Sequence, residues 1–333
     1  MTAPQTTINL LTGFLGSGKT TLLQRLLDHP DLRGAAVLIN EFGEVGLDHQ
    51  LLERIDANVV LMKSGCLCCT VRGEVADALL NLHDLRARGA VPWFDRVMIE
   101  TTGLADPYPV LSTIRAHPVL RSHFTAGAVI ATLDAVNGHG ILATREEALR
   151  QVAAADAVIV TKTDLVAAAS VDALEAMVKA INPTAAVHRA AGAAADLLLQ
   201  AGPGTVRALP ATPSTHVHHS AEGGAIQSFS IVTDAQLDWT SFGIWLTMLL
   251  HRHGDKVLRV KAILNIAGQE RPVAVHGVQR LVHPPVHMNG WPDDDRRSRL
   301  VFILRDLDPA LVRQSFDVFQ GLSSSRINAA LAS

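Results

Sequence analysis

The chain has 333 residues, a length that predicts two domains, because single hydrophobic cores rarely grow beyond about 250–300 residues. Hydrophobic residues make up 48% and charged residues 18%, which is typical of a folded globular protein and excludes a disordered chain. Its 29 basic and 32 acidic side chains leave a net charge of -3, so we expect neither nucleic acid nor an anionic membrane as a partner.

The first predicted strand, Thr7–Thr12, leads into a glycine-rich loop and a helix over Gly18–Leu27. The loop fits the phosphate-binding pattern G-x-x-x-x-G-K-[ST] at every specified position. Lys19 is expected on the β- and γ-phosphates and Thr20 on a Mg²⁺ ion. The predicted nucleotide-binding residues here are Gly13, Gly16, Ser17, Gly18, Lys19, Thr20 and Thr21. The flanking strand and helix disfavour the alternative, a glycine-rich turn that binds no nucleotide.

Two further predicted strands, Ala35–Asn40 and Asn58–Met62, each lead into a loop that carries metal-ligand side chains. The first loop contains Glu41 and Glu44, which suit a switch that contacts metal or nucleotide, although acidic loops are also common on solvated surfaces. We expect both strands to lie beside the P-loop strand, because consecutive strands are usually neighbours. The two loops would then respond to bound nucleotide.

The second of these loops holds every cysteine of the chain: Cys66, Cys68 and Cys69. Thiolates select Zn²⁺, Cu⁺ or Co²⁺ over Mg²⁺. No other cysteine is present to close a four-thiolate site, so a carboxylate, histidine, water or second molecule would complete the shell. The predicted transition-metal ligands are Glu41, Glu44, Cys66, Cys68 and Cys69. Inert cysteines and a Cys66–Cys69 redox pair are the alternatives.

A helix is predicted over Arg72–Arg88 and a strand over Arg96–Glu100. An apolar strand that delivers one acidic residue beside a P-loop is the Walker B arrangement, in which Asp is usual. Glu100 takes this place and is expected to reach the Mg²⁺ shell or to orient the attacking water. Gly103 follows, and its backbone N–H is positioned to donate to the γ-phosphate.

Helices are next predicted at Pro109–Ala116 and Glu146–Ala154, and strands at Ala126–Leu133 and Ala157–Thr161. The last strand ends in Thr161-Lys162-Thr163-Asp164, which matches [N/T]-K-x-D. A carboxylate at Asp164 accepts both the ring N1–H and the exocyclic amine of guanine, a donor pair that adenine lacks. The stem of Lys162 would pack along the base. This segment predicts selectivity for GTP.

A helix at Val171–Ile181 and a weak strand at Ala186–Arg189 complete an alternation of strands and helices. This alternation predicts an α/β fold, a P-loop NTPase domain over residues 1–204 with a mainly parallel sheet covered by helices. Ligands of such sheets bind beyond the carboxyl ends of the strands. Each cluster described above follows a predicted strand, as this rule requires.

Residues 205–224 are rich in Gly, Pro, Ser and His and predict a linker. Its short histidine tract, His216, His218 and His219, either recruits metal weakly or is ordinary polar linker. Beyond it, residues 225–325 predict a smaller α+β domain. The predicted strands are Ile226–Thr233, Lys256–Ile266, Pro272–His276, Arg280–Val286 and Leu300–Arg305, and the helices are Leu237–Leu250 and Pro309–Phe319. The charge run at 293–297 is expected to be a solvated loop.

The N-terminal residues Met1–Gln5 show neither a positive segment nor an apolar one, so we expect no secretory signal. No uncharged stretch approaches the ~20 residues that span a bilayer. Three clustered cysteines do not resemble a secreted disulfide framework. These features predict a cytoplasmic protein.

Together the segments GFLGSGKTT, NEFGEVGLD, GCLCCTVRGE, IETTGLADP and TKTD resemble the CobW-like branch of metallochaperone GTPases, relatives of the UreG and HypB nickel-insertion GTPases. The resemblance covers nearly the whole chain, although Thr161 stands where many members have Asn. It implies GTP hydrolysis to GDP and phosphate with slow turnover, and delivery of Zn²⁺ or Co²⁺ to a client metalloprotein or cofactor pathway. It also implies that Cys69, Thr70, Val71, Arg72 and Gly73 lie close to the nucleotide, and it is compatible with a nucleotide- or metal-dependent dimer.

Two other classes of function remain open from the sequence. One is a metal sensor or buffer whose hydrolysis acts only as a timer and which has no dedicated client. The other is a P-loop kinase or ligase, which would need a pocket for a phosphate acceptor and does not explain Asp164. The physiological metal and the client are not encoded in any motif of the chain.

Overall fold

The structure is a computed structural model that describes residues 5–27, 29, 34–39, 60–63, 71–190, 209–212, 214–219 and 224–331. Contacts divide the chain into two compact units. Of the described residues, the first unit contains those up to Val178 together with 185–190, and the second contains 179–184 and those from Leu209 onward. Each unit has its own sheet and its own hydrophobic core.

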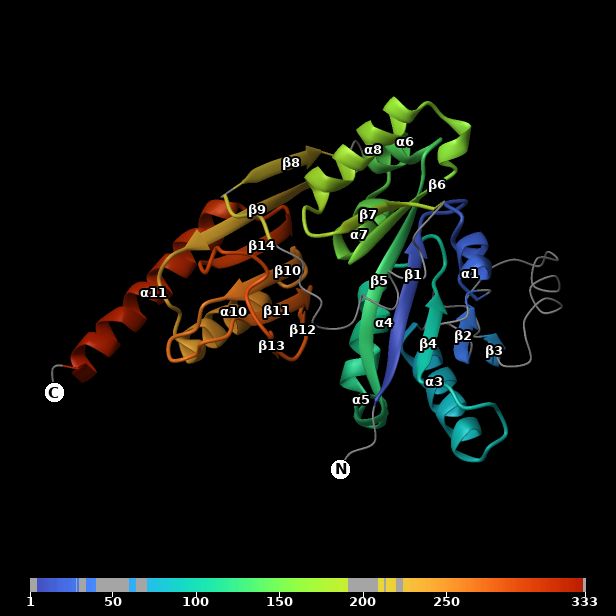
Figure 1. The fold of residues 1–333 in the computed structure, drawn as a ribbon, viewed down its shortest axis with the longest axis horizontal. Helices are drawn as coiled ribbons and strands as arrows, with labels where there is room; N and C mark the ends of the chain where they lie inside the picture. Colours follow the sequence, from blue (N-terminus) through green and yellow to red (C-terminus); the bar gives the residue numbers. More distant parts are fainter. Residues whose placement is uncertain are drawn as a thin grey trace. The chain divides into compact units, whose positions relative to one another are not determined.

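The first unit contains a seven-stranded sheet in the order β3-β2-β4-β1-β5-β6-β7, in which all neighbouring pairs are parallel (Figure 1). The strands are β1 (Thr6–Gly13), β2 (Ala35–Ile39), β3 (Val60–Lys63), β4 (Arg96–Glu100), β5 (Phe124–Asp134), β6 (Ala157–Thr161) and β7 (Ala186–Arg189). The predicted fold class is confirmed. Because the strands run in one direction, their carboxyl ends and the loops that follow them meet at one edge of the sheet.

The neighbours predicted for the P-loop strand are wrong. We expected β2 and β3 beside β1, but β4 and β5 flank β1, and β4 separates it from β2. Strand β3 lies at the edge of the sheet and pairs with β2. After β3 the chain passes through a helix and then forms β4, which lies between β1 and β2. No local sequence pattern encodes this order.

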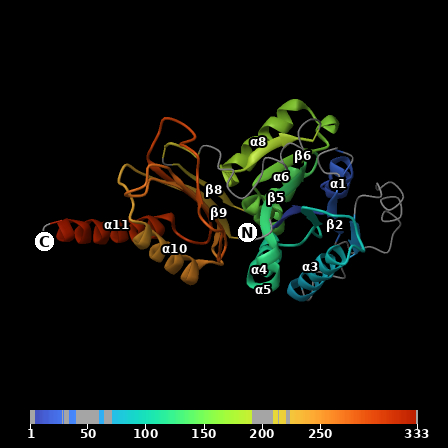
Figure 2. The same ribbon diagram turned by 60° about the horizontal axis from the view of Figure 1, so that its bottom comes forward.

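Helices cover both faces of this sheet, with α1 on one face and α3, α4 and α5 on the other (Figure 2). The helices of the first unit are α1 (Lys19–Leu27), α3 (Val71–Ala87), α4 (Pro107–Ala116), α5 (Pro118–His123), α6 (Gly138–Thr144), α7 (Glu146–Ala154), the 3-10 turn η2 (Thr163–Leu165) and α8 (Ala168–Ile181), whose last residues belong to the second unit. Leu22, Leu23 and Leu26 of α1 pack on apolar side chains of β1, β2, β4, β5 and β6. Among the described helices, none is both long and apolar enough to cross a membrane.

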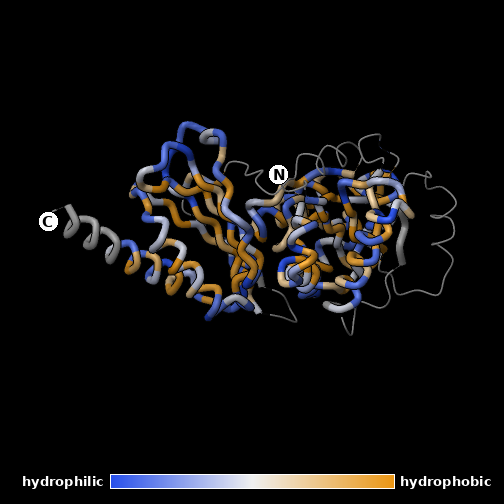
Figure 3. The backbone as a smooth tube through the Cα atoms, turned by 90° about the horizontal axis from the view of Figure 1, so that it is seen from below, coloured by the Kyte–Doolittle hydropathy of each residue, from blue (hydrophilic) through white to orange (hydrophobic). Residues whose placement is uncertain are grey.

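The second unit contains an antiparallel sheet in the order β12-β11-β10-β14-β9-β8, with β13 paired to β11. Its strands are β8 (Thr215–His219), β9 (Ala225–Thr233), β10 (Val257–Leu264), β11 (Val273–Val278), β12 (Leu281–Val282), β13 (Val286–His287) and β14 (Ser298–Arg305), and its helices are α10 (Trp239–His253) and α11 (Pro309–Leu331). Apolar segments gather along the strands and polar ones in the connections (Figure 3). The predicted smaller α+β domain is present.

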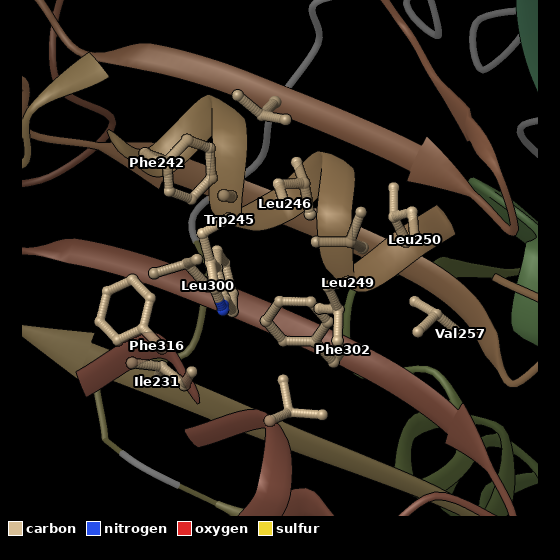
Figure 4. Close-up of a cluster of buried hydrophobic side chains, with 14 of the residues drawn as sticks. Ile231, Phe242, Trp245, Leu246, Leu249, Leu250, Val257, Leu300, Phe302 and Phe316 are labelled. Atoms are coloured by element: carbon tan, nitrogen blue, oxygen red, sulfur yellow. The ribbon is translucent and has the colours of Figure 1, made fainter. Parts of the chain in front are cut away.

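Helix α10 supplies five buried side chains of the second core, Phe242, Trp245, Leu246, Leu249 and Leu250 (Figure 4). Asp238 caps its N-terminus by accepting a hydrogen bond from the Ser241 N–H at 2.8 Å. Trp245 packs edge-on against Phe302 of β14 and Phe316 of α11. The side chains drawn and labelled from this core are Ile231, Phe242, Trp245, Leu246, Leu249, Leu250, Val257, Leu300, Phe302 and Phe316. Both helices therefore cover the same face of the sheet.

One predicted loop differs in the structure: the histidine tract, assigned to a linker over residues 205–224, forms strand β8. Its residues pair antiparallel with β9, His216 opposite Ser228 and His218 opposite Ile226. The strand lies at the edge of the sheet. Because an edge strand with exposed side chains has no buried face, it lacks the alternation of apolar and polar residues that reveals strands in a sequence.

Candidate functional site

The P-loop between β1 and α1 adopts a conformation that only glycine tolerates at several positions. Gly13, Gly16 and Gly18 have φ angles of 140°, 71° and 88°. A Cβ on Gly13 would lie 2.5 Å from the Thr132 carbonyl oxygen, so any side chain there would clash with β5. Space is open at Gly16, where a Cβ would meet nothing within 4 Å. The loop is thus packed against the sheet at its start and accessible at its middle.

The two predicted magnesium-site residues lie in direct contact. Thr20 Oγ1, in the first turn of α1, donates a hydrogen bond to Glu100 Oε1 at the end of β4 over 2.7 Å. Glu100 is 3% exposed, and Lys19, next to Thr20, is also buried. The Lys19 ammonium lies 3.4 Å from the Phe14 carbonyl oxygen, across the P-loop. A hydroxyl and a carboxylate at this position form the hard oxygen donor set that Mg²⁺ prefers.

The loop after β4 packs directly on the P-loop. Gly103 is buried, and a Cβ there would come within 2.6 Å of both the Leu15 backbone nitrogen and its side chain. Thr101 donates its backbone N–H to the Leu11 carbonyl oxygen over 2.9 Å, which continues the pairing of β4 with β1. The structure therefore brings predicted site residue Gly103 against the phosphate-binding loop, and a side chain at this position is excluded.

The predicted base-recognition segment follows β6 and is joined to the P-loop. Thr161 Oγ1 donates to the Ser17 carbonyl oxygen over 2.7 Å. Lys162 has a left-handed backbone, with φ 55°, and Asp164 lies exposed in the turn η2. The Thr161 hydroxyl thus connects the predicted base-recognition segment to the P-loop.

Asp134, at the end of β5, holds the lysine of this segment. Its carboxylate is 3% exposed and lies 2.7 Å from Lys162 Nζ. It also accepts hydrogen bonds from the Val136 N–H and from the side-chain amide and backbone N–H of Asn137. Burial raises the pKa of Asp134, but the hydrogen bonds from Lys162, Asn137 and Val136 outweigh burial and hold this pKa below its ordinary value of 3.8.

All five predicted transition-metal ligands lie outside the described residues. These are Glu41, Glu44, Cys66, Cys68 and Cys69, together with the predicted nucleotide contact Thr70. Val71, Arg72 and Gly73 form the first turn of α3, which follows edge strand β3. Strands β2 and β4 lie between β3 and β1, so the proximity of this turn to the nucleotide stays a prediction.

The described histidines of β8 do not build a metal centre with other ligand side chains. His216 is exposed and His218 is half-buried on the edge of the second sheet. In the part of the chain that the structure describes, no group of three or more His, Cys, Asp or Glu side chains is placed to hold a metal ion. Metal binding by the histidine tract stays a prediction.

Sequence motifs missed several polar residues that contact the P-loop or the loops beside it. Thr132 Oγ1 shares a 2.6 Å hydrogen bond with Ser17 Oγ, and Thr101 Oγ1 donates to Thr12 Oγ1 over 3.0 Å. Asp134 was open to prediction, because it directly follows the predicted strand Ala126–Leu133 and polar residues at strand ends line such sites. Gln151 lies inside helix α7 and carries no signal in the sequence.

Family models match both halves of the chain. Residues 7–189 match the CobW/HypB/UreG nucleotide-binding domain, and residues 226–320 match the cobalamin synthesis protein cobW C-terminal domain. The first of these matches spans the P-loop, Glu100, Gly103 and the base-recognition segment. It therefore covers the described site.

Similar proteins extend along nearly the full length of the chain. The zinc chaperone YjiA of Escherichia coli strain K12 is 34% identical over 312 residues, which cover 93% of this chain and 97% of YjiA. The zinc chaperone CobW of Sinorhizobium sp is 28% identical and covers 91% of this chain and 94% of its own. The crystal structure of Zn(II)-bound YjiA GTPase from E. coli superposes with a TM-score of 0.73 at 31% identity, covering 95% and 99% of the two chains. On these matches and the geometry of its P-loop, this chain belongs to the CobW/HypB/UreG family of nucleotide-binding proteins.

Proposed function

We propose that this GTPase binds a transition metal, zinc or cobalt, at Cys66, Cys68 and Cys69 and transfers it to a client protein or a cofactor pathway under the control of GTP. The relatives YjiA and CobW carry the name zinc chaperone, and YjiA has been crystallised with Zn(II). Three thiols in one loop are soft ligands that suit such a cargo.

The contact between Thr20 and Glu100 carries the nucleotide half of this proposal. It joins the start of α1 to the end of β4 at 2.7 Å. Thr20 and Glu100 would hold Mg²⁺, which when bound neutralises charge on the β- and γ-phosphates. Lys19 would turn from the Phe14 carbonyl oxygen toward the phosphates, and the Gly103 N–H would donate to the γ-phosphate.

Selectivity for guanine rests on Asp164, with Lys162 along the base. Asp164 is exposed in η2, where its carboxylate is accessible to a base edge. The left-handed Lys162 turns the chain sharply between β6 and η2, and its ammonium is held by Asp134. A carboxylate that pairs with the two donors of guanine would stay unpaired with adenine, and this disfavours ATP.

Strand register supports a link between nucleotide and metal. Glu100 pairs with Ile39 of β2, and Ile39 pairs with Lys63 of β3. Strands β2 and β3, which precede Glu41 and Cys66 in the sequence, therefore end at the same level as Glu100, although neither strand is next to β1. Bound γ-phosphate and Mg²⁺ would order the segments that carry Glu41 and Cys66 and strengthen metal binding in the GTP state.

The test is a titration of Zn²⁺, and separately of Co²⁺, into protein loaded with Mg²⁺ and a non-hydrolysable GTP analogue, repeated with GDP. We expect tighter metal binding in the GTP state by about 5- to 150-fold. The control is a variant with all three cysteines changed to serine, which should keep nucleotide affinity and lose metal affinity. Equal metal affinities in the two states would contradict the proposal, as would metal affinity that survives loss of all three cysteines.

Delivery requires a second measurement, because a sensor or buffer would also bind metal. A metal-free acceptor with matched affinity, such as a fluorescent chelator, should gain metal faster when GTP is hydrolysed than when the non-hydrolysable analogue is bound. Transfer at the same rate with both nucleotides would favour the buffer.

A further inference from the structure

Helix α7 is joined to the loop after β4 by a buried glutamine. Gln151 is 1% exposed, and its side-chain nitrogen donates to two carbonyl oxygens, those of Gly103 and Ala105, each at 3.1 Å. The neighbouring Arg150 lies 3.5 Å from Asp106, which caps the N-terminus of α4 by accepting from the Tyr108 N–H. One turn of α7 therefore contacts the loop at Gly103, Ala105 and Asp106.

We propose that Gln151 is a positioning residue for GTP hydrolysis, which acts by fixing the loop that carries Gly103 against the P-loop. This inference rests on the proposed role of Gly103 in binding the γ-phosphate. Gln151 itself touches only the two backbone carbonyl oxygens, so its effect passes through the loop and not through contact with the nucleotide.

The geometry of the loop explains why two carbonyl groups need to be held. Ala105 donates its N–H to the Thr102 carbonyl oxygen over 3.1 Å, which closes a turn with Gly103 at its second position. The N–H of that second residue takes no part in the hydrogen bond that closes a turn, so it is available to a ligand. Gln151 holds the peptide that follows Gly103 through a hydrogen bond to the Gly103 carbonyl oxygen, and Leu15 of the P-loop packs closely against Gly103.

Glutamine is the side chain that this position demands. A carboxamide offers two N–H donors on one nitrogen, and both neighbours here are acceptors. The side-chain oxygen, Oε1, is buried and has no hydrogen-bond partner among the described residues. A buried acceptor without a partner destabilises the fold. A role of the two donated hydrogen bonds in the reaction would explain why a glutamine occupies this position.

The test compares two buried amides of the first unit. Gln151→Met keeps the size of the side chain and removes both donors. Asn9→Leu is the matched control, because Asn9 is also 1% exposed, accepts one backbone hydrogen bond from Ala128 at 2.8 Å, and leaves its nitrogen without a partner among the described residues. Both variants lose a buried amide, but only Gln151 contacts the loop.

We expect Gln151→Met to lower kcat by about 10- to 100-fold, since small misplacement of a reacting group has effects of this size. The KM for GTP and the affinity for GDP should stay within about twofold, as Gln151 is not a nucleotide contact. Asn9→Leu should leave kcat within about twofold at temperatures well below its Tm. Equal changes of kcat in the two variants would overturn the inference, because a general loss of stability would then explain them.

A second variant separates donor chemistry from packing and keeps the inference testable if Gln151→Met does not fold. In Gln151→Glu, the carboxylate would face two carbonyl oxygens, and burial would raise its pKa. When protonated, it regains one O–H donor. Its kcat relative to the unchanged protein should therefore recover as pH falls from about 8.5 to about 6. A pH-independent ratio would overturn the inference, whereas failure of the unchanged protein to hydrolyse GTP would overturn the proposed function instead.

Discussion

Hydroxyl side chains connect the P-loop to the ends of three neighbouring strands. Ser17 shares a hydrogen bond with Thr132 of β5, and its carbonyl oxygen accepts one from Thr161 of β6. Thr20 donates to Glu100 of β4. Because a hydroxyl lies only one bond from Cβ, each contact fixes the separation of the backbones it joins. The P-loop is thus held in shape by its neighbours.

Glu100→Gln should separate hydrolysis from nucleotide binding. The amide oxygen of glutamine still accepts the Thr20 hydroxyl bond, but the negative charge that would face Mg²⁺ or the attacking water is lost. We expect kcat for phosphate release to fall by about 100-fold or more, with GDP affinity changed only a few-fold. Asp84→Asn, which breaks the exposed ion pair between Asp84 of α3 and Arg88 just beyond this helix, is the control and should alter neither quantity. Hydrolysis at the original rate by the Glu100 variant would show that its assigned role is wrong.

Asp134→Asn should lower the free energy of unfolding by about 1 kcal/mol near neutral pH. The reason is loss of a charge-assisted bond to Lys162, whose side chain is 37% exposed, so solvent screens part of the attraction. The pKa of Asp134 is held below 3.8 in the folded protein. Because this pKa is lower in the folded than in the unfolded protein, the ionised carboxylate stabilises the fold at pH values above the unfolded-state pKa. This stabilisation is lost as the pH falls through the folded-state pKa.

The measurement for Asp134 is urea unfolding of both proteins at several pH values. The stability difference should be constant between about pH 5 and pH 8 and shrink below about pH 4. A difference that persists undiminished in acid would show that packing and not charge is responsible. GTP affinity should also weaken in the variant, because Lys162 loses the group that orients it.

Single residues of the site were predictable where a motif fixes their chemistry and spacing. Lys19, Thr20 and Glu100 follow from two motifs, and the contact of Thr20 with Glu100 agrees with their predicted shared role. Gln151 was not predicted, because it lies inside a helix and acts on a segment 48 residues away in the chain, whereas the place of Asp134 at the end of a predicted strand was an available signal. Such long-range contacts leave no periodic or spaced pattern.

Elements with a strong hydrophobic pattern were predicted closely, and the weak strand at Ala186–Arg189 is also present as β7. Strands β4 and β6 and helix α7 have the predicted bounds. Helices α5 and α6 were not predicted, since six and seven residues are too few to display a helical period. The predicted strand Arg280–Val286 is instead two short strands, β12 and β13, separated by His283, Pro284 and Pro285. Proline lacks the N–H that a strand interior requires, which explains the break.

Trp245→Ala should destabilise the second unit by about 3–5 kcal/mol, the cost of truncating a large buried aromatic side chain. Trp245 is 2% exposed, contacts Phe302 and Phe316, and donates its indole N–H to Ser315 Oγ at 3.0 Å. Ile244→Ala on the same helix is the control, because Ile244 is 51% exposed and should change stability by less than about 0.5 kcal/mol. Urea unfolding followed by near-UV circular dichroism measures both, and similar losses in the two variants would contradict this account of the core.

At the scale of the whole chain, the order of the strands is what the sequence could not supply. Fold class and the alternation of elements follow from local patterns, but the position of β4 between β1 and β2 depends on how the crossovers pack. This order changes the argument for coupling. The last residues of β2 and β3, Ile39 and Lys63, lie in register with Glu100 of β4, and β4 separates both strands from the P-loop strand. Glu100 is then the described site residue nearest in register to the ends of both strands.

This register leads to a reciprocal prediction for the complete protein. If the GTP state binds Zn²⁺ more tightly, then Zn²⁺ must tighten binding of the GTP analogue by the same factor, because coupling between two binding sites is symmetric. The measurement is calorimetric titration of the analogue, and of GDP, into the protein with and without saturating Zn²⁺. We expect about 5- to 150-fold tighter binding of the analogue with zinc and little change for GDP. The variant with Cys66, Cys68 and Cys69 changed to serine should bind the analogue normally but without any effect of zinc. If zinc strengthens the binding of GDP and of the analogue equally, metal binding does not depend on which nucleotide is bound. The site would then be a permanent structural zinc site, and the proposed chaperone function would be wrong.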